Sequence, residues 1–311
     1  MRFLTFSFFL SFFSLSLAQI GGNSAQPQVR ETRVLGNRYV FVQNPLFAPV
    51  TFEFEVRGTN LSLSGRTKFV QVFPPRSLTL AFWGKPAQPA VPWSLSYSWH
   101  YIMGDINAVP DGAVYDLPFA PGQSFRINQG YDGAFSHQKE LEYSLDFALP
   151  EGTPIYAARE GVVVAVQSEY SVGRVDPALK SCANYITVLH PDGTFAHYAH
   201  LHFGGSLVKV GDQVRRGQTI GFSGNTGYTS GPHLHFHVYQ ATSATGGWKT
   251  VPTLFETSAG AGMLVEGLTY ARPGGEIQQA NRPLPSLTPV SLRPASAPVG
   301  GSSSADTGKA R

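Results

Sequence analysis

The chain has 311 residues, enough for two domains of ordinary size, and its formal net charge at neutral pH is only +3. Arg2 and the segment from residue 273 onward account for all of this charge, so residues 19–272 are neutral overall. A neutral body lacks the clustered lysines and arginines that a nucleic-acid groove needs, so nucleic acid is excluded as an expected partner.

Residues 1–18 have the parts of a secretory signal peptide. Arg2 gives a positive n-region, Phe3–Leu15 an apolar h-region, and Ser16-Leu17-Ala18 a small-residue cleavage pattern. The apolar run is shorter than the ~20 residues of a spanning helix, so we expect cleavage after Ala18, with a retained membrane anchor as the alternative. We therefore expect a secreted or periplasmic protein of the cell envelope, monomeric and not stably inserted in the membrane.

Short runs of alternating apolar and polar residues, with abundant glycine and proline, predict a mainly β fold. In residues 19–114, segments such as "VTFEFEV" (50–56) place their apolar residues on one face of an antiparallel strand. We expect an N-terminal β-sandwich there, with an immunoglobulin-like arrangement as one option. Residues 115–272 form a second β-rich block, and the Pro-, Ser- and Gly-rich residues 273–311 predict a disordered tail.

Three of the nine histidines lie on alternate residues of "SGPHLHFHVYQ" (230–240). On a β-strand, His233, His235 and His237 share one face, while the apolar residues between them fill the other. A core face would prefer aliphatic residues, so the pattern predicts a metal or proton-transfer site. Three partly buried histidines with ordinary hydrogen bonds are the alternative.

Two other segments each place a polar group on an apolar strand. In "YSLDFALPEGTP", Asp146 follows Leu145 and precedes Phe147, a costly position unless the carboxylate is paired or binds a cation. His200 lies in "HYAHL", where strand alternation puts it on the same face as Tyr198. We expect Tyr198 to orient His200, with simple burial of Tyr198 as the alternative. The same alternation predicts that His197 points away from His200.

Four segments in the same order resemble the sequence signature of the lysostaphin-like (LytM-type) zinc metalloendopeptidases. "GNTGYTSGPHLHFHV" resembles the segment that supplies the H-x-H pair, and "HYAHL" is similar to the Tyr-x-His-Leu segment. "LDFALPEGTPIYAAREGVVV" is similar to the strands that hold the metal-binding Asp, and "VKVGDQVRRGQTIGFSGNTG" resembles the loop-rich region before the H-x-H strand. The resemblance covers roughly residues 117–265 and implies the duplicated hybrid motif fold, a hairpin-rich antiparallel sheet, for residues 115–272.

The resemblance also implies the site residues and one bound Zn²⁺ ion. Asp146 and His235 correspond to zinc ligands. His233 and His200 would lie beside the activated water, as base and transition-state stabiliser. Two histidines and one carboxylate are a familiar zinc set, so one further histidine is expected.

The remaining ligand in the family is usually a His four residues before the Asp, a position that Glu142 holds in this chain. We expect His137 to take that role, because "GAFSHQKELEYSLDF" resembles a branch of the family with a longer loop between the two ligands. Glu142 is the alternative ligand. His237 stands where the family often has Glu, and we expect a structural role for it.

Three further residues are expected to lie outside the site. Cys182 is the only cysteine, so no internal disulfide can form, and we expect it to be a small buried hydrophobe. His190 and His202 follow or precede turns, and we expect both to be exposed to solvent.

The implied function is a secreted zinc metalloendopeptidase that hydrolyses peptide bonds in bacterial peptidoglycan, in cross-bridges or stem peptides. A catalytically inactive wall-binding or hydrolase-regulating relative is the alternative. A lipoyl- or biotin-type carrier would need a modifiable lysine at a hairpin tip, which "TPIYAAREGVVVAV" and "VKVGDQVRRGQTI" do not present. The chain has no G-x-S-x-G elbow, which argues against a serine hydrolase.

Overall fold

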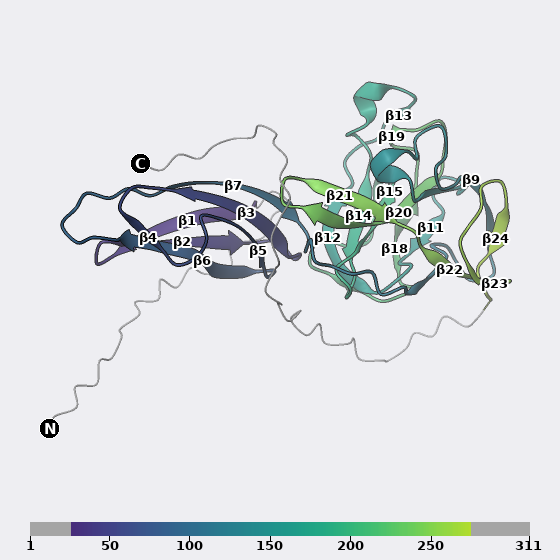
Figure 1. Cartoon of the computed structure of the whole chain (residues 1–311). Coiled ribbons are helices and arrows are strands. Elements are labelled where there is room, and N and C mark those ends of the chain that lie inside the picture. The colour runs from purple at the N-terminus through teal and green to yellow at the C-terminus, as the bar shows by residue number, and fades with distance from the viewer. Residues whose placement is uncertain (1–25, 275–311) are drawn as a thin grey trace.

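The structure is a computed structural model that describes residues 26–274, and these residues are mainly β, as predicted. The predicted signal peptide and the tail from residue 275 onward lie outside the described residues. Two units follow each other along the chain, an elongated one built from β1–β7 and a larger one built from the later strands (Figure 1). Between residues 26 and 274, no helix has the length and apolar character needed to cross a bilayer.

The N-terminal unit consists of two antiparallel sheets, with strand orders β1-β2-β6-β4 and β5-β3-β7. The strands are β1 (Gln28–Val34), β2 (Asn37–Asn44), β3 (Val50–Arg57), β4 (Leu61–Leu63), β5 (Lys68–Phe73), β6 (Ser77–Pro86) and β7 (Ser96–Met103). The apolar residues of β3 are buried, as the alternation predicts, and Phe52 and Phe54 pack in a core that both sheets share. The immunoglobulin-like arrangement stays a prediction.

A nine-stranded sheet dominates the C-terminal unit, in the order β17-β12-β14-β15-β20-β10-β9-β24, with β21 also paired to β20. Its strands are β9 (Ser124–Gln129), β10 (Ser144–Phe147), β12 (Gly161–Gln167), β14 (Tyr185–Leu189), β15 (Phe195–Ala199), β17 (Gln213–Val214), β20 (Leu234–Ser243), β21 (Gly247–Val251) and β24 (Thr269–Ala271). Every pair in this sheet is antiparallel.

Smaller sheets and two short 3-10 helices complete this unit. The sheets are β11-β18-β16, β23-β22-β8 and β13-β19. Their strands are β8 (Val114–Asp116), β11 (Pro154–Tyr156), β13 (Gly173–Arg174), β16 (Leu201–Ser206), β18 (Thr219–Ser223), β19 (Gly227–Tyr228), β22 (Leu254–Thr257) and β23 (Gly260–Gly262). The helices are η2 (Lys139–Leu141) and η3 (Pro177–Leu179).

The main core lies against one face of the nine-stranded sheet. The residues of β20 that face it are Leu234, Phe236 and Val238, each no more than 1% exposed. Because side chains alternate along a strand, this anchoring turns His235 and His237 toward the opposite face. The apolar core therefore fixes which way the histidines of β20 point.

The two units meet at one end of the β15–β20 pair. Ala48 of the N-terminal unit packs against Phe195 of β15, whose cross-strand partner is Tyr239. Gly104, with φ +123°, allows this approach, because an added Cβ would lie 2.9 Å from the Cβ of Ala241. His235 lies four residues before Tyr239, so it is roughly 13 Å along β20 from this contact between the two units.

Candidate metal centre

Three strands bring the histidine-rich face of β20 together with its neighbours. On one side β10 pairs with β20 so that Asp146 lies opposite His235. On the other side β15 pairs with β20 so that His197 lies opposite His237. In an antiparallel pair of strands, directly opposite residues point to the same face of the sheet. The side chains of Asp146, His235, His197 and His237 therefore lie on one face.

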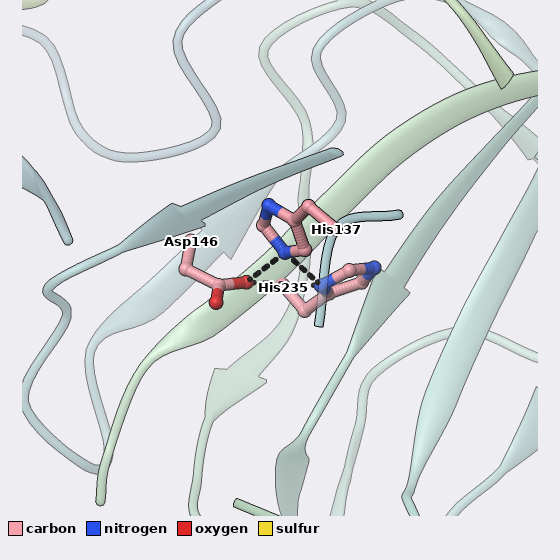
Figure 2. Close-up of side chains that lie close together, drawn as sticks. All are labelled: His137, Asp146 and His235. Carbon is pink, nitrogen blue, oxygen red and sulfur yellow. Dashed lines mark hydrogen bonds and ion pairs between the residues drawn. The ribbon is translucent and has the colours of Figure 1, made fainter. Parts of the chain in front are cut away.

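Three side-chain atoms from three segments meet on this face (Figure 2). The Asp146 Oδ1 atom lies 2.9 Å from His235 Nδ1 and 3.2 Å from His137 Nε2, and the two imidazole nitrogens are 3.3 Å apart. Two ligands on a tetrahedral zinc-sized ion lie about 3.3 Å from each other, given bonds of about 2.0 Å. The spacing and the donor types therefore fit one divalent metal ion bound by two imidazoles and a carboxylate.

His137 reaches this cluster from the loop before β10, not from a strand. Its backbone N–H donates to the Gly133 carbonyl at 3.0 Å, and the Asp132 N–H donates to the Glu142 carbonyl at 2.8 Å, which closes the loop. The His137 side chain is fully buried. Glu142 ends the η2 turn and does not belong to the group of side chains that could hold a metal among residues 26–274.

His233 and His200 flank the three-residue cluster. Their ring centroids are 4.6 Å apart, and His233 Nε2 lies 3.7 Å from Asp146 Oδ1. His233 Nδ1 donates to the Gly231 carbonyl at 2.8 Å, and His200 Nδ1 donates to the Thr226 carbonyl at 2.6 Å. Because a carbonyl can only accept, each Nδ1 carries the proton and each Nε2 is left as an acceptor.

His200 does not follow the strand alternation that its segment predicts. Its φ is +61°, in the left-handed region, and it lies between the end of β15 and the start of β16. This backbone turn brings its ring next to His233, whereas Tyr198 faces the core and its hydroxyl accepts from the Ala158 N–H at 2.9 Å. The prediction that Tyr198 orients His200 is therefore wrong, and the alternative, burial, accounts for Tyr198. The prediction that His197 points away from His200 is also wrong, since His197 lies opposite His237 on the face toward which the His200 ring turns.

The electrostatics of the cluster favour a cation. Burial alone would raise the pKa of Asp146, but the adjacent imidazoles of His137 and His235 outweigh it and hold that pKa well below its usual range. Burial lowers the pKa of His235, although contact with the carboxylate opposes the shift. Burial, followed by the neighbouring His233 and His235, lowers the pKa of His200 to about 3. At neutral pH the carboxylate of Asp146 thus lies beside the neutral imidazole of His235, and these are the protonation states that bind metals.

Two other histidines and the cysteine lie away from the cluster. His202 is exposed, as expected, but His190 is only 2% exposed, so the prediction of a solvent-facing side chain is wrong for it. The His190 Nδ1 donates to the Glu160 carbonyl at 2.7 Å, and this hydrogen bond holds the ring in its buried position. Cys182 is half-buried and has a free thiol.

An aromatic contact that the sequence did not predict lies next to His137 in the chain. Phe135, two residues before His137, stacks on Tyr228 with ring centroids 5.8 Å apart, and the Lys180 ammonium lies 5.7 Å from the Tyr228 ring centroid. The contact joins the His137 loop to β19. A sequence pattern could not have revealed it, since the three residues come from segments far apart in the sequence.

Comparisons with known proteins show what the region that holds Asp146 and His235 is similar to. The sequence pattern of Peptidase family M23 matches residues 140–246. The chain is 42% identical over 93 residues to the peptidoglycan DD-endopeptidase ShyA of Vibrio cholerae, a match to 30% of this chain and 19% of ShyA. It is 36% identical over 121 residues to the glycyl-glycine endopeptidase ALE-1 of Staphylococcus capitis, a match to 39% of this chain and 30% of ALE-1.

One solved structure illustrates the extent of the likeness. The catalytic domain of the prophage-encoded M23 protein EnpA from Enterococcus faecalis is 27% identical, with a TM-score of 0.32, and the match covers 43% of this chain and 93% of that one. The chain thus spans less than a third of ShyA and ALE-1 but nearly all of an isolated M23 catalytic domain.

Proposed function

We propose that this chain, which carries a peptidase family M23 domain, is a zinc metalloendopeptidase that hydrolyses peptide bonds in bacterial peptidoglycan, in cross-bridges or stem peptides. The observation that carries the proposal is the contact among His137 Nε2, Asp146 Oδ1 and His235 Nδ1. The names of ShyA and ALE-1, both endopeptidases, support the reaction class, and that of ShyA supports peptidoglycan as the substrate.

Zinc is the metal we propose, with His137, Asp146 and His235 as its three protein ligands. Catalytic zinc sites keep three protein ligands and leave a fourth position for water or substrate. When bound, the ion would act as a Lewis acid on the scissile carbonyl and would acidify the attacking water. Asp146 and His235 are only 9% and 8% exposed. The dielectric constant around them is therefore lower than in water, which strengthens the attraction between the carboxylate and a bound cation.

His233 is the proposed general base. Its Nε2 is an acceptor because Nδ1 donates to the Gly231 carbonyl, and the same Nε2 lies 3.7 Å from Asp146 Oδ1. A water held at the metal ligands would therefore be within reach of this nitrogen, which can take its proton. The protonated ring can afterwards give that proton to the leaving amine.

His200 is the proposed stabiliser of the transition state. At rest its Nε2 is also an acceptor, because Nδ1 donates to the Thr226 carbonyl. It can donate to an oxyanion only after its Nε2 has taken a proton from solvent, and negative charge developing beside it favours that state. The left-handed backbone at His200 costs roughly 1–2 kcal/mol, a strain that is common at functional residues.

The proposed location is the cell envelope or the exterior, reached through residues 1–18. The support is the n-region, h-region and cleavage pattern of these residues. N-terminal sequencing of the exported protein should begin at Gln19. A first residue of Met1 on the exported protein would show that the segment is kept as an anchor.

Digestion of purified peptidoglycan tests the function. Full-length protein is incubated with directly cross-linked and with glycine-bridged peptidoglycan, with and without a chelator, and fragments are analysed by mass spectrometry. We expect fragments that show amide hydrolysis, abolition by the chelator, and recovery with zinc. Asp146→Ala should release nothing, while His202→Ala, at an exposed histidine outside the cluster, should match the wild type. No release from either substrate by zinc-loaded protein would favour the inactive wall-binding relative.

A further inference from the structure

A fifth histidine lies directly behind the proposed zinc ligand His235. His237 Nδ1 is 2.9 Å from His235 Nε2, and the two residues are only 6% and 8% exposed. Both come from β20, two residues apart, so the strand itself aims the two rings at the same side of the sheet. This contact is not part of the mechanism described above.

His235 differs from its neighbours in the nitrogen that faces the metal site. His137 turns Nε2 to the site and gives its Nδ1 proton to the Gly130 carbonyl at 2.8 Å. His200 and His233 likewise give their Nδ1 protons to backbone carbonyls. His235 presents Nδ1 instead, so its proton must lie on Nε2 if Nδ1 is to bind a metal. The atom that meets this Nε2 is the imidazole nitrogen of His237.

We infer that His237 is a positioning residue, whose Nδ1 accepts the Nε2 proton of His235 and so keeps His235 Nδ1 free for the metal. The inference rests on the proposed zinc site. Two groups compete for the single proton of neutral His235, because the Asp146 carboxylate, 2.9 Å from Nδ1, would also accept it. Without the His237 acceptor the proton would move to Nδ1, where it blocks the ligand position, and the buried Nε2 would lose its partner.

The ring of His237 is held in the plane that this hydrogen bond requires. Trp248 of β21 stacks on one side at 15° with centroids 5.9 Å apart, and His197 of β15 stacks at 28° with centroids 5.1 Å apart. His197 in turn shares a 2.9 Å hydrogen bond with the Thr187 hydroxyl. A neutral imidazole has one nitrogen without a proton, so His237 Nδ1 can accept when the ring's own proton lies on Nε2.

Zinc affinity in three full-length variants tests the inference. His237→Leu removes the acceptor at similar volume, whereas His237→Gln retains a carbonyl oxygen that can accept. His202→Gln is the control, since it makes the same replacement at an exposed histidine outside the cluster. Affinities are measured by competition with a chromophoric chelator, and thermal unfolding of the metal-free proteins shows that each is folded. Loss of an outer partner of a metal ligand typically weakens binding 10- to 100-fold. We expect that loss in His237→Leu, and less than about threefold in His237→Gln and His202→Gln.

The second readout is the tautomer of His235 in metal-free protein, from the ¹⁵N chemical shifts of its imidazole. The wild type should carry the proton on Nε2, and His237→Leu should carry it on Nδ1. Any of three results would overturn the inference. They are a wild-type zinc affinity in His237→Leu, equal losses of affinity in His237→Leu and His237→Gln, and a proton on Nδ1 of His235 in the wild type. If His237→Leu does not fold, the zinc affinity of His237→Gln and the tautomer of His235 in the wild type still test the inference. A wild type that binds no zinc would refute the proposed function, and the tautomer would then test the inference alone.

Discussion

His190 should make the stability of the C-terminal unit depend steeply on pH between about 6.5 and 4. The side chain is 2% exposed, its Nε2 has no hydrogen-bond partner among residues 26–274, and the edge of the Tyr115 ring lies against it with centroids 5.3 Å apart. Burial lowers the pKa of His190 from 6.5 to about 4, and nearby Arg159 adds to the shift, while the Glu160 carbonyl opposes it. The replacement that tests this is His190→Gln, which keeps a donor for that carbonyl and does not titrate.

The sign and size follow from proton linkage. Above pH 6.5 the His190 ring is neutral in both folded and unfolded chains, so its full contribution to stability is present. As pH falls from 6.5 toward 4, the unfolded chain binds a proton that the folded chain does not, and stability drops by about 1.4 kcal/mol per pH unit. The loss sums to about 3 kcal/mol and ends near pH 4, where both states are protonated.

The assay is hydrogen exchange of the β14 amides in urea at several pH values from 7.5 to 4, which reports on the C-terminal unit separately from the N-terminal one. We expect the free energy of unfolding of the wild type to fall about 3 kcal/mol further than that of His190→Gln over this range. Parallel pH profiles for the two proteins would refute the reasoning, because they would mean that His190 is accessible to protons in the folded state.

Three comparisons of variants test the roles assigned at the site. His235→Ala should lose both zinc and activity, whereas His233→Ala should keep most of its zinc and lose turnover by about 10²- to 10⁴-fold; equal zinc loss in elemental analysis would contradict these roles. His137→Ala should lose zinc and Glu142→Ala should retain it, and the reverse would make Glu142 the ligand. Tyr198→Phe should lower the free energy of unfolding by about 1–3 kcal/mol, because the buried Ala158 N–H loses its acceptor, and should leave kcat unchanged. A lower kcat at full stability would show that Tyr198 does orient His200.

The mainly β fold and the direction of the β20 histidines could be predicted from the sequence, because strand alternation is a local property. Leu234 and Phe236 alternate with the histidines, so burying them in the core leaves one orientation for His235. Asp146 could be singled out for a similar reason, as a lone carboxylate between two apolar neighbours. That these residues would face each other depended on the resemblance, since nothing local specifies which strands pair.

Other features could not be predicted, because they depend on tertiary contacts or on a single backbone angle. The left-handed φ of His200 takes it out of the strand alternation, and the packing around His190 buries a residue beside a turn. The contact between His235 and His237 depends on ring orientations that the stacked Trp248, from another strand, helps to set. Neither the composition nor the periodicity of the sequence indicates these arrangements.

The central claim is that His137, Asp146 and His235 bind one metal ion, and anomalous diffraction at the zinc edge tests it most directly. Crystals of the zinc-loaded protein should give one strong peak about 2.0–2.2 Å from His137 Nε2, Asp146 Oδ1 and His235 Nδ1. A peak bound by other side chains, such as one that includes Glu142 in place of His137, would contradict the ligand set. No peak near Asp146 and His235 in zinc-loaded crystals would contradict the claim itself.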